Sequence, residues 1–287
     1  MDKIFDVVIV GAGLGGVILA RQLQSQNVLL IDKAKSPGGR AATRRVGGVP
    51  VNHGLDQFQA HHPLLKELTS FGFHEDFFTR DGDVYKSIAA INNWVKLLAQ
   101  DLKLENLKTV SSIEEHEGIY RILDNESEII AQSVKVVLAT PAPQAHEILK
   151  RSNLASDFLK EVEYSSLICH YVMLKQKFEH RDLILLKEAQ AGFLYSYKFS
   201  ERLPDTLKVM PREELNLHYL KLFSIPNDII IDSYTHRWLY SQVKKSIPEK
   251  YQFSFADQNL FLLGDYFSLN GVEGVIKAVL SLEKSLS

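Results

Sequence analysis

The sequence predicts an α/β protein in which a largely parallel sheet is combined with a second, strand-rich region. Three observations favour this fold class. An apolar N-terminal run passes directly into a glycine-rich turn and then into a helical pattern. A second apolar run ends in an acid, Asp32, and a third, Asn259–Asp265, ends in glycine and an acid. From about Leu154 the composition changes to short strand-like stretches that polar turns separate.

The first element is an N-terminal strand followed by a glycine turn and a helix. Residues Ile4–Val10 are apolar without alternation, as in a strand that is buried on both faces. The next segment, Gly11-Ala12-Gly13-Leu14-Gly15-Gly16, fits the pattern G-x-G-x-x-G, and Leu14–Leu23 has helical spacing. In this pattern the first glycine permits a tight turn, the second lets the backbone approach a pyrophosphate, and the third allows close packing. We therefore expect this turn to hold phosphate groups.

The second strand, Val28–Ile31, leads to the acid that such a site requires. Asp32 follows Gly11 by 21 positions, close to the spacing of about 20 that is typical of a ribose-binding acid. Its carboxylate would accept hydrogen bonds from the adenosine ribose and would repel a 2′-phosphate. Glycine-rich turns also occur for purely structural reasons, but strand, helix and acid together favour an adenine dinucleotide other than NADP.

The segment Lys33–Arg45 favours FAD over NAD. Pro37 and the pair Gly38-Gly39 would interrupt an ordinary crossover helix. We expect instead a loop that folds back over the cofactor, with its amides and Arg40 neutralising the second phosphate. A basic surface loop is the alternative.

The C-terminal region supports the same interpretation. The strand that ends at Gly264-Asp265 is followed by Asn270-Gly271-Val272-Glu273-Gly274 and a helix to Leu286. This arrangement would place an acid against a polyol chain and a helix N-terminus near a negatively polarised ring edge. FAD has both a ribitol and such a ring, whereas NAD has neither.

Several segments together resemble the renalase-like branch of the flavin-containing amine oxidase superfamily. They are GAGLGG, PGGRAATRR, VNHGLDQF, VVLATPAPQA, HRWLY and LFLLGDYFSLNGVEG. The resemblance implies a glutathione-reductase-type FAD-binding Rossmann domain with an inserted α+β substrate domain that contains an antiparallel sheet. The resemblance also implies which residues would contact FAD, and we include residues next to them in the sequence. The candidate FAD contacts are then Gly11, Ala12, Gly13, Gly15, Gly16, Asp32, Lys33, Gly39, Arg40, Thr140, Gly264, Asp265, Gly271 and Val272. The chain departs from the family pattern at Asn52–Phe58 and at Lys277-Ala278.

The expected organisation is discontinuous. Residues 1–60, 88–150 and 250–287 would form the FAD-binding domain, and residues 61–87 and 151–249 the substrate domain. Hydrophobic periodicity predicts helices over Leu64–Phe71, Ile88–Leu102 and Pro211–Leu222. It predicts strands over Leu107–Ile113, Ile119–Leu123, Val134–Ala139, Cys169–Leu174, Leu183–Leu186, Phe193–Phe199, Thr206–Met210 and Ile229–His236. A turn at Thr140–Pro143 would lie beside the cofactor.

The candidate catalytic residues are His236, Trp238, Tyr240 and His53. The first three belong to a segment where the substrate domain would rejoin the FAD domain, a common location for ligands. They would form an aromatic wall above the flavin, and an ordinary strand with a buried tryptophan is the alternative. His53 is a candidate flavin neighbour because Gly54 suggests a close backbone approach. No metal site is expected, since the pair His61-His62 has no partner at metal-ligand spacing.

Flavin oxidation next to nitrogen requires hydride delivery more than a strong base, so positioning on an apolar face suffices. The resemblance implies oxidation of dihydronicotinamide isomers, with O₂ as acceptor. Oxidation of a small amine is an alternative, and a flavin-binding module with little turnover is another. Cys169 lies far in sequence from the expected flavin contacts, so FAD would bind noncovalently.

Composition narrows the partners and the compartment. Lysine and arginine total 33 and aspartate and glutamate 35 in 287 residues, so no net field favours nucleic acid, and a small-molecule substrate is expected. No apolar run is long enough to span a bilayer. Cys169 is the only cysteine, which fits a reducing compartment. We therefore expect a cytoplasmic protein.

Overall fold

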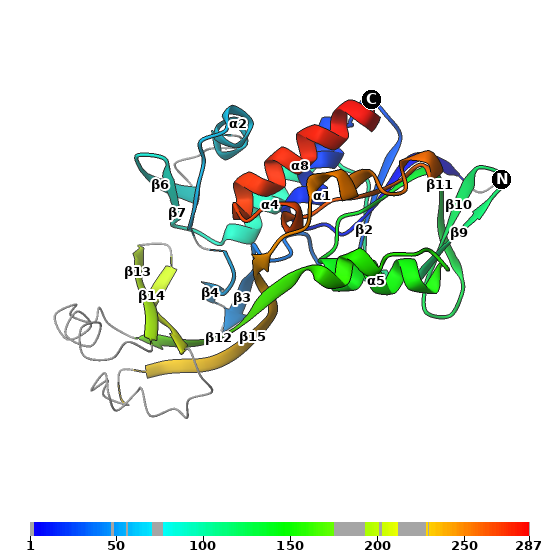
Figure 1. Cartoon of the computed structure of the whole chain (residues 1–287). Coiled ribbons are helices and arrows are strands. Elements are labelled where there is room, and N and C mark those ends of the chain that lie inside the picture. The colour runs from blue at the N-terminus through cyan, green and yellow to red at the C-terminus, as the bar shows by residue number, and fades with distance from the viewer. Residues whose placement is uncertain are drawn as a thin grey trace.

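The computed structural model describes residues 3–46, 49–55, 57–70, 77–174, 193–200, 203–211, 228 and 230–286. Its main sheet is mixed and has the strand order β8-β2-β1-β11-β10-β9, with β16 also paired to β11 (Figure 1). The strands span Ile4–Val10 (β1), Val28–Asp32 (β2), Leu104–Asn106 (β8), Ser112–His116 (β9), Ile119–Leu123 (β10), Ile129–Leu138 (β11) and Leu260–Leu262 (β16).

The parallel part of this sheet joins segments from three regions of the chain. β1 lies between β2 and β11, and both pairs are parallel. The first half of β11 pairs with the antiparallel strand β10, and its second half, Val136–Leu138, pairs with the parallel strand β16. The carboxyl ends of β1, β2, β11 and β16 therefore meet at one edge, which is where ligands bind in open α/β sheets.

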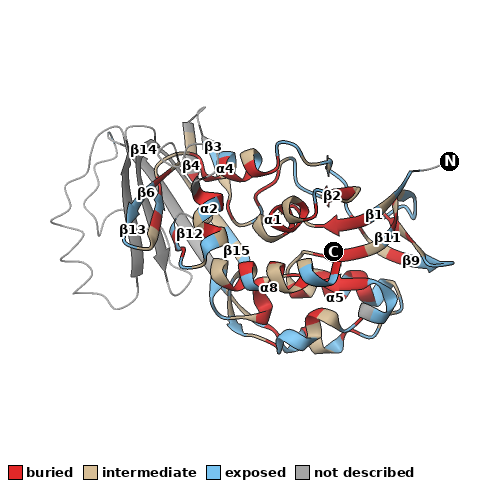
Figure 2. Ribbon diagram, turned by 90° about the horizontal axis from the view of Figure 1, so that it is seen from above, coloured by how far each residue is buried: buried red, intermediate tan, exposed pale blue. Residues whose placement is uncertain are grey.

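Helices cover both faces of the sheet and create two hydrophobic cores. Val7 and Ile9 of β1 pack into one core with α1, α4 and α8, and Val8 and Val10 pack into the other with α5. Figure 1 shows α8 on one side of the sheet and α5 on the other, and Figure 2 shows the ends of β1 and β11 coloured as buried. The prediction of a strand buried on both faces is therefore confirmed. The helices span Leu14–Gln22 (α1), Ile91–Leu98 (α4), Ala142–Arg151 (α5) and Gly271–Leu286 (α8).

A second sheet is formed by the chain between α5 and β16. It is antiparallel with the order β13-β14-β12-β15, and its long pair β12 and β15 runs away from the main sheet (Figure 1). Two smaller sheets, β3-β4 and β5-β7-β6, and the helix α2 complete the fold. Their bounds are Thr43–Val46 (β3), Val49–Asn52 (β4), Gln57–Gln59 (β5), Pro63–Ser70 (α2), Phe78–Asp81 (β6), Val84–Ser87 (β7), Glu163–Leu174 (β12), Phe193–Ser200 (β13), Leu203–Pro211 (β14) and Ile230–Lys245 (β15).

Several predicted elements differ from the structure in type or in bounds. The strand predicted over Cys169–Leu174 begins at Glu163, and the one predicted over Ile229–His236 continues to Lys245. The helix predicted over Ile88–Leu102 is shorter and spans Ile91–Leu98. Pro211 ends β14 instead of beginning a helix, and the rest of that predicted helix lies outside the described residues, as does Leu183–Leu186. The strand predicted from Leu107 begins only at Ser112, because Leu107 adopts a left-handed conformation with φ of 61°. The turn predicted at Thr140–Pro143 gives way to α5 at Ala142, since proline fits the first turn of a helix.

No helix among the described residues combines the length and the apolarity needed to cross a membrane.

Candidate functional site

The three glycines of the turn Gly11–Gly16 have different roles. Two of them are needed for packing within the protein, and the third leaves room for a ligand. Gly11 has φ of 114°, and a Cβ there would lie 2.6 Å from the carbonyl oxygen of Ala139. A Cβ on Gly16 would collide with the carbonyl oxygen of Gly11. A Cβ on Gly13, in contrast, would have no heavy atom within 4 Å. Internal packing therefore explains Gly11 and Gly16 but not Gly13, which borders open space in front of α1.

Asp32 lies beside this open space at the end of β2. Its two carboxylate oxygens accept hydrogen bonds from the backbone N–H groups of Ala12, at 2.5 Å, and Ala34, at 2.7 Å. Each oxygen keeps a second lone pair for a ligand hydroxyl. Lys33, the next residue, is exposed. Asp32 is thus fixed against the glycine turn in an orientation that suits a ribose.

Asn106 is a site residue that the sequence analysis missed. It ends β8 and is the register partner of Asp32, so the two side chains project to the same face. Its Oδ1 is buried and has no hydrogen-bond partner among the described residues. Because burying a polar atom without a partner is costly, this oxygen is a candidate acceptor for a ligand donor. Asn106 ends the strand next to the one that ends at Asp32, and this position at a strand end could have indicated it as a site residue.

The segment after Asp32 folds back onto the glycine turn, as the sequence predicts. The N–H of Gly38 donates to the carbonyl oxygen of Ala12 at 2.9 Å, and Gly38 forms a parallel bridge with Gly13. Gly39 has φ of 54°, and a Cβ there would lie 3.0 Å from the Cα of Gly13. The second glycine pair therefore lies directly against Gly13, the residue that borders the open space.

Two of the predicted cofactor contacts bind each other. Nη1 of Arg40 forms an ion pair with Oδ2 of Asp265 at 2.7 Å and also donates to the carbonyl oxygen of Ser241 at 3.2 Å. The Asp265 side chain is 8% exposed and that of Arg40 is 36% exposed. This contact ties the loop after β2 to β15 and to the end of β16. Within the described residues only Nη1 of this guanidinium has a partner, so its other N–H groups could bind a ligand.

Buried polar atoms collect at the carboxyl ends of β11 and β16. Oγ1 of Thr140 and the hydroxyl of Tyr266 are buried without a hydrogen-bond partner among the described residues. The Tyr266 ring occupies the position that a side chain on Gly264 would need. Burial raises the pKa of Tyr266 and also that of Tyr164, although the latter accepts a hydrogen bond from the N–H of Ala142. Both phenols therefore stay protonated and able to donate.

The start of α8 closes this edge of the sheet. The 3-10 turn Asp265–Phe267 leads through Ser268–Asn270 to Gly271, which has φ of 53°, and to Val272. No atom lies within 4 Å of the position that a Cβ on Gly271 would take. The first turn of α8 is thus accessible next to the Arg40–Asp265 pair.

His53, His236 and Trp238 form an aromatic cluster, together with Tyr234, which the sequence analysis missed. The ring centroids of His53 and His236 are 4.7 Å apart, and those of His236 and Trp238 are 4.4 Å apart. Nε1 of Trp238 donates to the carbonyl oxygen of His53 at 3.0 Å. The Tyr234 ring lies 6.3 Å from that of His53. Alternation of ring residues along β15 was the signal that could have indicated Tyr234.

Tyr240 does not join this cluster. Its ring contacts Tyr164 instead, with centroids 5.4 Å apart. The pairing of β12 and β15 is irregular at this point, because Trp238 pairs with Leu167 and Gln242 with Ser165, which leaves extra residues in β15 between these two pairs. The close approach that Gly54 suggested is also to protein rather than to a ligand, because a Cβ there would collide with the carbonyl oxygen of Arg40.

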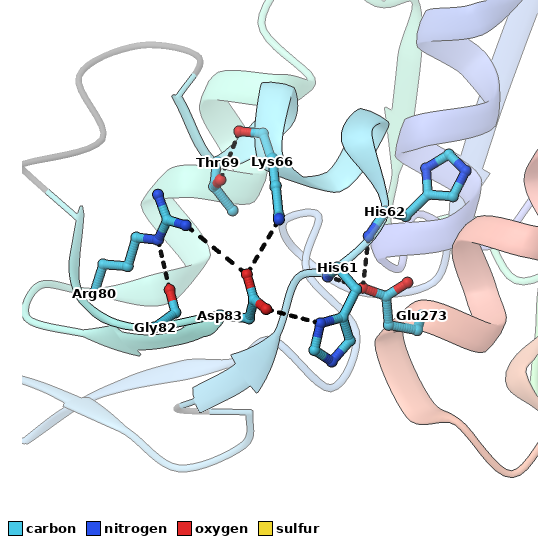
Figure 3. Close-up of polar contacts among 8 residues, drawn as sticks. All are labelled: His61, His62, Lys66, Thr69, Arg80, Gly82, Asp83 and Glu273. Atoms are coloured by element: carbon cyan, nitrogen blue, oxygen red, sulfur yellow. Dashed lines mark hydrogen bonds and ion pairs between the residues drawn. The ribbon is translucent and has the colours of Figure 1, made fainter.

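The pair His61-His62 has a structural role at the start of α2 (Figure 3). Both backbone N–H groups donate to Oε1 of Glu273 on α8, at 2.5 and 3.1 Å. Nδ1 of His61 lies 3.1 Å from Asp83, which also pairs with Lys66 at 3.1 Å. These contacts attach α2 and the β6–β7 hairpin to the first turn of α8. Within the described part of the chain, no three metal-ligating side chains come together.

We expect the imidazole of His236 to titrate below its ordinary pKa of 6.5, because burial and the positive charge of Arg44 both lower its pKa. The unfolded chain then binds this proton more readily than the folded chain, so the group removes stability as the pH falls below about 6.5. An NMR titration of the histidine ring signals, with His236→Asn for assignment, measures the midpoint. A midpoint at or above 6.5 would contradict this description of the cluster.

Comparisons with known proteins agree with this architecture. Residues 9–70 match the family of NAD(P)-binding Rossmann-like domains. A CLA-producing fatty acid isomerase from P. acnes is 12% identical with a TM-score of 0.70, and the match covers 99% of both chains. Cyclohexylamine oxidase from Brevibacterium oxydans IH-35A is 10% identical with a TM-score of 0.69, again over 99% of both chains. A reduced UDP-galactopyranose mutase is 11% identical with a TM-score of 0.69, over 99% of this chain and 96% of that one. Residues 9–70 are therefore similar to a Rossmann-like domain, and the chain has a fold that enzymes of different activities share.

Proposed function

We propose that this protein is an FAD-dependent oxidoreductase that binds FAD noncovalently. The observation that carries the proposal is the open space at Gly13, which lies between Asp32 and the folded-back pair Gly38-Gly39. A pyrophosphate would lie there, because the second glycine of this pattern lets the backbone approach it closely. When bound, FAD would supply reversible two-electron redox chemistry at its ring.

The residues at the sheet edge fit the remaining parts of FAD. Asp32 and Asn106 would bind the adenosine, and Asp265 the ribityl chain. Thr140 and the first turn of α8 at Gly271-Val272 would face the ring system. The buried oxygens of Thr140 and Asn106, which have no hydrogen-bond partner among the described residues, support such a ligand.

The proposed domain organisation is a glutathione-reductase-type FAD domain with an inserted substrate domain. Residues 1–60, 88–150 and 250–287 would hold the cofactor, and residues 61–87 and 151–249 would cover it. The four-stranded sheet supports this division, because it lies in sequence between α5 and β16.

We propose a renalase-like reaction, the oxidation of a dihydronicotinamide isomer by hydride transfer to flavin N5, with O₂ as the electron acceptor. In this reaction His53, His236 and Trp238 would position the planar substrate ring and exclude water. The pKa of His236 is lowered by burial and by Arg44, which supports an imidazole that is neutral at neutral pH. An electron-rich ring needs no strong base from it.

Two alternatives follow from other observations. The same fold occurs in cyclohexylamine oxidase, and this similarity favours a small amine as the substrate of the present protein. A flavin-binding module with little turnover is the other alternative.

We expect the purified protein to show a flavin absorbance band that acid releases, and a dihydronicotinamide isomer to bleach this band under anaerobic conditions. Readmitted air should restore the band with formation of peroxide. Bleaching by amines alone would select the amine oxidase, and a flavin that neither class reduces would select the binding module. A protein that takes up no FAD would refute the proposal.

A further inference from the structure

We propose that Arg44 forms an anion-binding subsite at the edge of the aromatic cluster, so that the substrate is a planar ring compound with a carboxylate or phosphate rather than an ammonium group. This inference rests on the proposed function, because it takes the cluster as the place where the substrate binds.

The geometry places a cation against the cluster. Arg44 lies on β3, and its Cζ is 4.7 Å from the centroid of the Tyr234 ring. Tyr234 in turn lies beside His53, whose ring contacts His236 and Trp238. A guanidinium that stacks on a ring face keeps its N–H groups in the plane, where they can bind a carboxylate or phosphate in bidentate fashion.

This cation has no acid to neutralise it within the described part of the chain. Arg44 forms no ion pair there, and its side chain is exposed. Arg40, on the same folded-back segment, has its charge matched by Asp265 at 2.7 Å. Of these two arginines, one is thus used within the protein and the other is available to a ligand.

The charge of the cluster selects between ligand classes. Among the described side chains that form it, Arg44 carries the only permanent charge, and His236 is held neutral at neutral pH by burial and by Arg44 itself. A bound ammonium would meet a like charge, and a bound anion an opposite one. At separations of several ångströms in a partly solvated site, such a difference amounts to about 10-fold or more in affinity.

The test uses three probes of similar size and different charge: benzoate, benzamide and benzylamine. Binding is measured on the purified protein, as isolated, by tryptophan fluorescence and by perturbation of any flavin absorbance. We expect benzoate to bind about 10-fold more tightly than benzylamine, with benzamide between them. Phenyl phosphate replaces benzoate in a parallel series and shows which anion the subsite prefers.

Variants assign the preference to one side chain. Arg44→Gln should remove it, and Arg44→Lys should keep part of it, since the charge remains and the planar fork is lost. Arg45→Gln is the matched control: it removes the same charge from the next residue of β3, which projects to the opposite face. Thermal unfolding of each variant checks that it is folded.

Equal binding of benzoate and benzylamine to the unaltered protein would overturn the subsite. So would loss of the preference in Arg45→Gln as well as in Arg44→Gln, because general surface charge would then explain it. The proposed function fails separately: a protein that prefers benzoate but takes up no FAD keeps the subsite and loses the flavin proposal. A protein that binds FAD but shows no preference for benzoate keeps the flavin proposal and loses the subsite.

Discussion

Replacing Gly13 with alanine is expected to weaken FAD binding at least 10-fold while the protein stays folded. The backbone at this position has φ of −67° and ψ of 175°, which any residue adopts, and the added methyl meets no protein atom within 4 Å. Alanine should even raise the free energy of unfolding by about 0.4–1 kcal/mol, since it restricts the unfolded chain. The methyl group would instead occupy the space proposed for the pyrophosphate. Titration of the apoprotein with FAD and thermal unfolding measure the two effects separately.

The matched control for this experiment is Gly16→Ala. Here the new methyl would collide with the carbonyl oxygen of Gly11, so the apoprotein itself should lose about 1–3 kcal/mol of stability or more. The two substitutions make the same chemical change three residues apart and should have opposite signatures. Unaltered FAD affinity in Gly13→Ala would mean that the open space is not the pyrophosphate site.

Replacing Arg40 with methionine should destabilise the protein by about 3 kcal/mol. The substitution keeps most of the apolar stem but leaves the buried carboxylate of Asp265 without its partner, and removing one member of a buried pair is costly. It also removes the hydrogen bond to the carbonyl oxygen of Ser241. Urea unfolding of the apoprotein measures the loss without any contribution from a cofactor.

A double-mutant cycle identifies the cause of that loss. In Arg40→Met combined with Asp265→Leu no unpaired charge remains, so the double variant should be less destabilised than the sum of the two single variants. Additive effects would show that the two side chains do not stabilise each other, contrary to their 2.7 Å contact.

Local sequence patterns predicted the part of the fold on which the nucleotide site depends. Ile4–Val10 and Ile119–Leu123 have the bounds expected from the sequence, because each is a short apolar or alternating run next to a clear turn. The glycine pair at Gly38-Gly39 likewise indicated the folded-back loop, since proline and glycine exclude a helix on local grounds.

The contacts that complete the site could not be predicted in this way. The partners in the Arg40–Asp265 pair are 225 residues apart, and those in the His53–Trp238 hydrogen bond are 185 apart. Nothing in either local segment specifies such a partner. Tyr240 contacts Tyr164 where the pairing of β12 and β15 is irregular, and such an irregularity depends on the register of two strands rather than on the pattern of one.

The long strand β11 has a consequence for how this protein is made. Its edge at Val136–Leu138 is completed by β16, which follows more than 120 residues later in the chain. During synthesis the backbone groups of that edge have no strand partner until residues 260–262 have left the ribosome. Synthesis is slow compared with chain collapse, so the earlier part of the sheet can form while this edge is still unpaired. An unpaired edge of this kind attracts other chains. Nascent chains of this protein should therefore depend on chaperones late in translation, and capture of the cofactor should follow the arrival of β16 rather than that of the glycine turn.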